Sequence, residues 1–160
     1  MPIDKNMSIL VVDDFYTMTQ LVRNLLKSLG FHNIDEARDG TSALEKMAET
    51  KYDLVISDWN MKPMTGIEFL RSLRAGGNTI PFILVTAENA VENVIEAKQA
   101  GVSAYIMKPF NADTLKSRLV KVFGEFWFSP HPRPVVTLAP HAHPVYVKIM
   151  RVLLLVTEFE

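Results

Sequence analysis

Four short apolar runs in this chain are each followed directly by polar or charged residues that could take part in chemistry. Asp13 and Asp14 follow residues 9–12, Asp58 follows 54–57, Thr86 follows 82–85, and Lys108 follows 104–107. If these runs are neighbouring parallel strands, all five residues meet at one edge of the sheet, where open α/β folds place their sites. We therefore expect a single site built from four strand ends.

Three carboxylates gathered at such an edge need positive charge among them. At a separation of about 4 Å and an effective dielectric of about 20, each pair repels by roughly 4 kcal/mol. Lys108 neutralises only part of this charge, and an all-oxygen ligand set points to a hard divalent cation, Mg²⁺ above all. Beside the metal, the Asp58 carboxylate could attack a phosphoryl group, whose oxygens Lys108 and Thr86 would bind.

Each of these residues also has an ordinary structural explanation. An Asp-Asp pair after a strand is most often a turn or a helix cap, a Lys-Pro pair is usually part of a loop, and a lone threonine is usually a satisfied hydroxyl. The joint spacing favours the site, because residues of complementary type follow four strands in one chain.

The segments between the runs have the periodicity of helices. Before Gly30, apolar residues recur at intervals of three and four, which predicts an amphipathic helix that ends at this glycine. These residues are Met18, Leu21, Val22, Leu25, Leu26 and Leu29. Four further helices are predicted after Gly40, after Gly66, before Gly101 and after Asn111. Residues 34–37 form a weaker strand, suited to a sheet edge. The predicted fold class is α/β, a doubly wound five-stranded parallel sheet in three α/β/α layers.

Composition excludes several classes of function. The chain has 160 residues, of which 48% are hydrophobic and 22% charged, so one domain with a substantial core is expected. A formal net charge of −1 offers no basic field for a phosphate backbone, which argues against binding of nucleic acid. The chain has no cysteine and its polar start is no signal peptide, so we expect a cytoplasmic protein.

The motifs at the strand ends resemble those of a known family. They are similar to the motifs of CheY-like receiver domains of two-component response regulators, in particular the chemotaxis branch. The matching segments are Asp13-Asp14, Asp58 to Met61, Val85 to Glu88 and Tyr105 to Phe110. The resemblance covers about residues 5–125 and implies the flavodoxin-like strand order 2-1-3-4-5, for which CheY is itself a standard example.

The resemblance implies a role for each site residue. Asp58 would be the phosphorylation site, and Asp14, Asp58 and the backbone carbonyl of Asn60 would hold Mg²⁺, with Asp13 as the second acidic residue. Lys108 and Thr86 would bind the phosphoryl group, and Tyr105 would be an aromatic switch that turns from exposed to buried. Asn60 and Glu88 would tune the rate of dephosphorylation.

The resemblance also implies a signalling function and its partners. The chain would accept a phosphoryl group from a CheA-like histidine kinase and switch a surface that binds a flagellar motor switch or another effector protein. It would not be an enzyme, beyond catalysing its own phosphorylation and dephosphorylation. The alternatives are a phosphate sink for a kinase, or an interaction module driven by the C-terminal tail, with a cyclic dinucleotide as one candidate ligand.

The chain departs from the family in two places. Lys62 stands between Met61 and Pro63, where the family usually has proline directly after methionine, so a cation is added near the site, and it either binds the phosphoryl group or points into water. We predict a receiver domain at 1–125, a Pro/His-rich linker at 126–144 and an apolar C-terminal segment at 145–160. The last segment is too short to span a membrane, and could mediate self-association.

Overall fold

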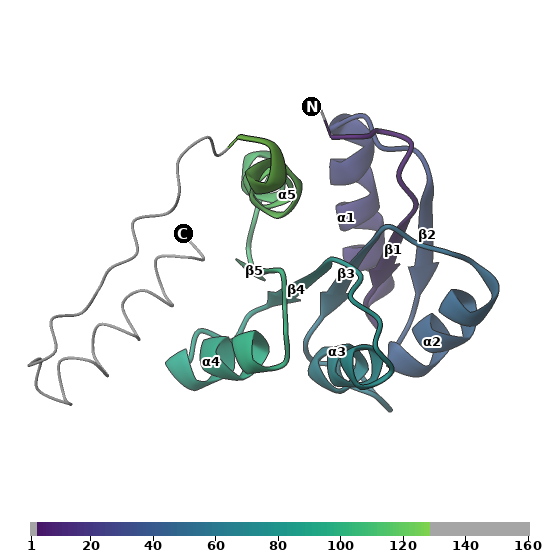
Figure 1. Ribbon diagram of the computed structural model, residues 1–160, viewed down its shortest axis with the longest axis vertical. Helices are drawn as coiled ribbons and strands as arrows, with labels where there is room; N and C mark the ends of the chain where they lie inside the picture. The colour runs from purple at the N-terminus through teal and green to yellow at the C-terminus, as the bar shows by residue number, and fades with distance from the viewer. Residues whose placement is uncertain (1–2, 129–160) are drawn as a thin grey trace, which may run out of the picture.

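Five strands alternate with five helices in the computed structural model, which describes residues 3–128 (Figure 1). The elements are β1 (Ile9–Val12), α1 (Tyr16–Ser28), β2 (Ile34–Ala37), α2 (Gly40–Glu49), β3 (Leu54–Asp58), α3 (Gly66–Ala75), β4 (Phe82–Thr86), α4 (Val91–Gln99), β5 (Ala104–Met107) and α5 (Ala112–Phe128). Asp58 and Thr86 are thus the last residues of their strands rather than the first residues beyond them.

The strands form one parallel sheet in the order β2-β1-β3-β4-β5. The predicted doubly wound fold is confirmed, and so is the edge position of the weak strand at 34–37. Val12 pairs with Ser57, Asp58 with Val85, and Thr86 with Met107. This register aligns the carboxyl ends of the four strands that carry the candidate residues.

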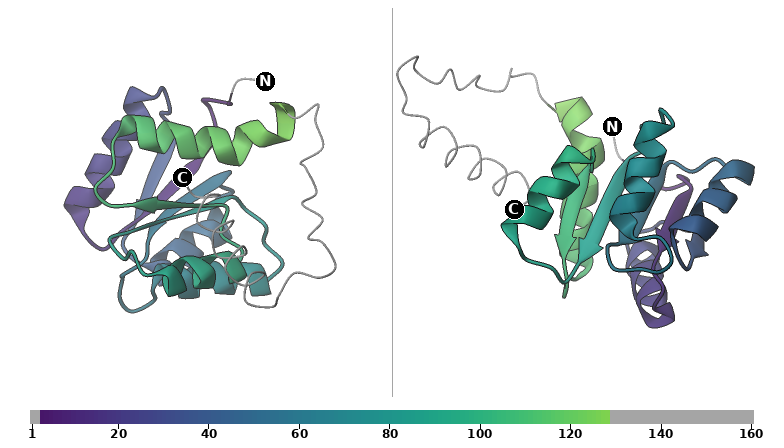
Figure 2. Two further views of the ribbon diagram at one scale, coloured as in Figure 1. Left: turned by 90° about the vertical axis from the view of Figure 1, so that its left-hand side faces the viewer. Right: turned by 90° about the horizontal axis from the view of Figure 1, so that it is seen from below.

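Helices cover both faces of the sheet. Figures 1 and 2 show α1 and α5 on one face and α2, α3 and α4 on the other. Alternate strand residues enter the two cores: Ile9 and Val11 pack with the α1 and α5 side, and Leu10 and Val12 with the opposite side. Because both faces are covered, β1, β3, β4 and β5 are nearly continuous apolar runs instead of alternating ones.

The five predicted helices are confirmed, but Leu21, which the periodicity assigns to the buried face of the first helix, is exposed. Leu21 is 42% exposed, whereas Thr19 in α1 is buried. The buried stripe of α1 is Thr19, Val22 and Leu26, and the Thr19 hydroxyl donates to the carbonyl of Tyr16 at 2.8 Å. A threonine whose hydroxyl is satisfied within its own helix can occupy a core position that periodicity assigns to an apolar residue.

The last helix continues to Phe128, three residues past the domain boundary predicted after residue 125. The remainder of the predicted linker and the C-terminal segment at 145–160 lie outside the described residues, so the predicted domain division stays a prediction. Among residues 3–128, no helix combines the length and the apolar character needed to cross a bilayer.

Candidate functional site

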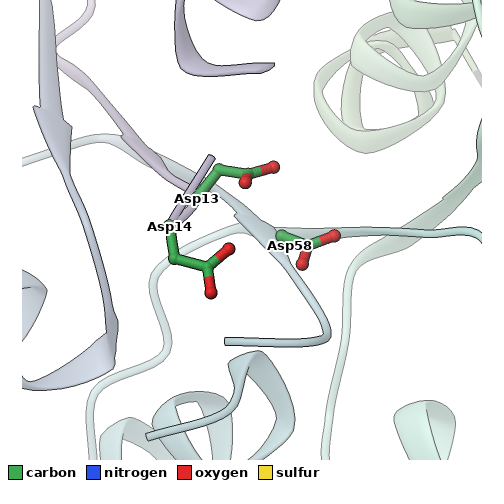
Figure 3. Close-up of side chains that lie close together, drawn as sticks. All are labelled: Asp13, Asp14 and Asp58. Carbon is green, nitrogen blue, oxygen red and sulfur yellow. The ribbon is translucent and has the colours of Figure 1, made fainter. Parts of the chain in front are cut away.

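Three aspartates meet at the carboxyl ends of β1 and β3 (Figure 3). Their carboxylate oxygens lie within 4.8 Å of one another. The backbone positions them, since the amide of Asp13 donates to Ala37 on β2 and the amide of Trp59, next to Asp58, donates to Val85 on β4. These backbone hydrogen bonds to the neighbouring strands β2 and β4 fix the positions of the aspartates.

Lys108 reaches this cluster from the end of β5. Its ammonium group lies 2.7 Å from Asp58 Oδ1 and 3.4 Å from Asp13 Oδ2. The Lys108 side chain is 22% exposed, and the two carboxylates it contacts are largely buried. Four of the five residues predicted to converge therefore lie together, with charges of both signs in partial contact with water.

Burial and charge shift the acid-base behaviour of this cluster. The pKa of Asp13 is raised, chiefly by burial and further by the charge of Asp58, although a hydrogen bond from the amide of Phe15 and the charge of Lys108 oppose the rise. Burial lowers the pKa of Lys108, but the hydrogen bond and charges of Asp58 and Asp13 outweigh it, so the net shift is upward. Lys108 is consequently charged at neutral pH.

The donor set suits a hard cation. Three carboxylates face one ammonium group, so their negative charge exceeds the positive charge that the side chains supply. The pKa of Asp13 is raised chiefly by burial and in addition by the charge of Asp58, and a bound cation would lower the cost of ionising this carboxyl. Carboxylate oxygens at this spacing fit a divalent ion that prefers oxygen ligands.

Thr86 ends β4 beside the cluster, but its hydroxyl is engaged elsewhere. The residue is fully buried, and Oγ1 accepts a hydrogen bond from the amide of Glu88 at 3.0 Å. Its side chain also forms a hydrogen bond with Tyr105, so the predicted contact with a phosphoryl group needs the hydroxyl to turn. Glu88 itself is exposed.

Tyr105 lies in its inward position, with only 3% of its surface exposed. Its hydroxyl donates to the carbonyl of Glu88 at 2.8 Å, and its ring meets Trp59 edge-on with 6.5 Å between centroids. Burial raises the pKa of Tyr105 to about 12, despite an opposing hydrogen bond with Thr86. The proposed switch residue thus contacts the residue next to Asp58 on one side and the loop after β4 on the other.

The sequence analysis did not identify the residues that contact the backbone carbonyl of Asp58. The Asp58 carbonyl accepts a hydrogen bond from the Ser57 hydroxyl at 2.9 Å, and a Cβ at Gly66 would lie 2.0 Å from the same carbonyl oxygen. Thr65 and Glu68 form a capping box that begins α3 at this glycine. The helix start was predicted correctly at Gly66, and the Thr-x-x-Glu spacing visible in the sequence is a further signal for it.

Replacing Asp13 with asparagine should stabilise the metal-free protein at neutral pH. Asparagine keeps an oxygen for the amide of Phe15 and removes one charge from the cluster. Because the folded pKa of Asp13 is raised, its ionisation destabilises the fold once the pH exceeds that pKa, and costs nothing well below the unfolded value. We expect a gain on the order of 1 kcal/mol at pH 7 that fades below about pH 4.

Urea unfolding of the parent and the variant with EDTA, at pH 7 and again below about pH 4, measures this gain in the free energy of unfolding. A variant that is less stable than the parent at pH 7 would show that the contact with Lys108 outweighs the repulsion among the aspartates.

Comparison with known proteins gives one consistent result. The family profile described as the response regulator receiver domain matches residues 9–120. The chain is 50% identical to the chemotaxis protein CheY-3 of Vibrio cholerae over 123 residues, which cover 76% of this chain and 95% of that protein. It is 48% identical to the chemotaxis protein CheY of Pseudomonas aeruginosa over 119 residues, 73% of this chain and 96% of that one.

A solved structure agrees with these sequence matches. The chemotaxis response regulator CheY4 of Vibrio cholerae superposes with a TM-score of 0.67 at 34% identity, over 73% of this chain and 98% of that structure.

Proposed function

The chain belongs to the family of response regulator receiver domains, and on that premise we propose that Asp58 is the carboxylate that accepts the phosphoryl group. The observation that carries the proposal is the 2.7 Å contact between Lys108 and Asp58 inside a group of three aspartates. Asp58 is the last residue of β3, the strand that lies between β1 and β4.

In the proposed reaction a bond forms between Asp58 Oδ2 and phosphorus. The bond from phosphorus to the donor breaks, and the leaving group departs with its electron pair. Lys108 holds Asp58 Oδ1 and thereby orients the carboxylate; once the group is transferred, the same ammonium can pair with a phosphoryl oxygen. The Thr86 hydroxyl is the second proposed donor to that group.

We propose Mg²⁺ as the metal, held by Asp14, Asp58 and the backbone carbonyl of Asn60, with Asp13 as the additional acidic residue. When bound, the ion supplies positive charge that neutralises the phosphoryl oxygens. Asp13 contributes from a buried position, where it keeps Lys108 close to the acceptor.

The signal would leave the site through Trp59 and Tyr105. Transfer adds nearly two negative charges next to Lys108 and Thr86. If Thr86 turns toward them, it gives up its bond to the Glu88 amide and frees the loop against which the Tyr105 hydroxyl is held. Asn60 and Glu88, both exposed near the site, are the residues proposed to set the lifetime of the phosphoryl group.

Both curated relatives are chemotaxis proteins, and we propose chemotactic signalling for this chain as well. The donor would be a histidine kinase and the target a motor switch or another effector protein in the cytoplasm. Binding of the target should strengthen when Asp58 is modified, whereas a phosphate sink would accept phosphate and bind no target.

The direct test is intact mass after incubation with acetyl phosphate and Mg²⁺. A gain of about 80 Da, the mass of one added phosphoryl group, that disappears with EDTA and maps to the peptide containing Asp58 supports the proposal. An adduct on another residue contradicts it, and so does the absence of both an adduct and a change in Trp59 fluorescence in the presence of metal. Trp59 fluorescence recorded in parallel detects modification that hydrolyses too fast for the mass measurement.

A further inference from the structure

An open groove runs from the acidic site along the loop between β3 and α3. It measures about 820 Å³ and is lined by Asp14, Asn60, Met61, Lys62, Pro63, Thr65 and Glu68. This volume lies within the range of pockets that hold small molecules. Asp14 and Asn60 also belong to the proposed phosphorylation site, so the groove begins where the reaction would take place.

Lys62 is the one cation among the residues that line the groove. Within residues 3–128 its side chain forms no ion pair, although Glu68 lies in the same groove. Glu68 is engaged otherwise, since its Oε2 accepts hydrogen bonds from the amide and hydroxyl of Thr65 at 2.8 and 2.9 Å. The ammonium of Lys62 is therefore available to a ligand in the groove.

An in-line transfer puts the leaving group on the side of phosphorus opposite the attacking carboxylate. Asp58 attacks from the sheet, where it is 8% exposed, and an in-line displacement puts the departing atom on the far side of phosphorus. Asp58 does not line the groove, but Asp14 and Asn60 of the proposed site do, so a donor that enters along the groove would carry its leaving group toward Lys62. A leaving group that departs as an anion there would meet the carboxylate of Asp14, and a nearby ammonium group would offset the repulsion.

We propose that Lys62 selects for small acyl phosphates as phosphoryl donors, because it stabilises the carboxylate that they release. This inference rests on the proposed function of Asp58. In the reaction, the bond between Asp58 and phosphorus forms, the bond from phosphorus to the acyl oxygen breaks, and the carboxylate leaves with that electron pair and needs no proton. A donor that releases a neutral amine gains nothing from Lys62.

The test compares two donors of different leaving-group charge, acetyl phosphate and phosphoramidate. Rate constants for labelling of the full chain with Mg²⁺ are measured for the parent and for Lys62→Gln. We expect the rate with acetyl phosphate to fall about fivefold and the rate with phosphoramidate to change less than about twofold. Raising the salt concentration should slow the labelling of the parent by acetyl phosphate and leave the labelling rate of Lys62→Gln nearly unchanged.

Two further variants serve as controls. Lys51→Gln makes the same change in net charge at an exposed residue before β3, at the other end of the sheet, and should behave as the parent does. Lys62→Arg keeps the charge and should restore most of the rate with acetyl phosphate. Unfolding in urea verifies that the exposed substitutions leave the fold intact.

The outcomes separate the two proposals. An equal fall with both donors, a fall that Lys51→Gln reproduces, or no fall at all overturns the role of Lys62 while Asp58 remains the acceptor. Absence of labelling of Asp58 in the parent with either donor overturns the proposed function, and the role of Lys62 with it.

Discussion

Asp58→Asn gains no mass with acetyl phosphate and Mg²⁺ under conditions in which the parent gains about 80 Da. Asparagine has nearly the same shape and can still accept the hydrogen bond from Lys108, so the fold is kept. What it loses is the nucleophile, because a neutral amide oxygen attacks phosphorus far more slowly than a carboxylate does. We expect labelling to fall at least about 1000-fold, which corresponds to about 4 kcal/mol of activation free energy.

A charge-matched control separates loss of the acceptor from loss of charge. Asp113→Asn removes one carboxylate from an exposed position in the first turn of α5 and should label as the parent does. If Asp58→Asn is labelled as fast as the parent, the acceptor is another residue, and Asp13 and Asp14 are the next to be replaced.

Gly66→Ala damages both stability and the site. The added Cβ would lie 2.0 Å from the carbonyl oxygen of Asp58 and 3.0 Å from the side chain of Leu84, so either α3 or the end of β3 must move. Because the nearest atom belongs to the backbone, no side-chain rotation relieves the contact. We expect a loss of at least about 2 kcal/mol in the free energy of unfolding, at the upper part of the range for overpacked cores.

Urea unfolding measures this loss, and Gly76→Ala is the matched control. Gly76 follows the same helix with an ordinary φ of −78°, and a Cβ there would meet its nearest neighbour at 3.5 Å. Alanine at Gly76 should change the stability by less than about 0.5 kcal/mol. If the two variants are equally stable, α3 does not press on the Asp58 carbonyl as the structure indicates. Labelling of Gly66→Ala should also slow, since the acceptor strand is displaced.

The sequence predicts the fold and the meeting of the charged residues because both follow from local rules. Strands buried on both faces are continuous apolar runs, and in parallel strands the polar residues that end them share one edge. Asp13, Asp14, Asp58 and Lys108 come together for this reason. The edge position of residues 34–37 was predictable because charged residues interrupt the only weak strand.

Other features depend on contacts between distant parts of the chain. The Thr86 hydroxyl bonds to the Glu88 amide, and Tyr105 packs inward on Trp59, through side-chain orientations that spacing does not encode. The contact between Gly66 and the Asp58 carbonyl exists only once α3 packs on β3. Leu21 has the right period for the core of α1, yet its position lies beyond what the sheet and α5 cover.

The strand order also determines how the molecule opens. β3 lies between β1 and β4, so the amides around Ile56 are released to solvent only when the sheet itself comes apart. β5, which carries Tyr105, is an edge strand with one neighbour, and can loosen at a smaller cost in free energy. A phosphoryl group on Asp58, the proposed acceptor, would therefore be attached to a central strand, whose amides we expect to exchange slowly. The proposed rearrangement of Tyr105 would instead take place on an edge strand, which opens at a smaller cost in free energy.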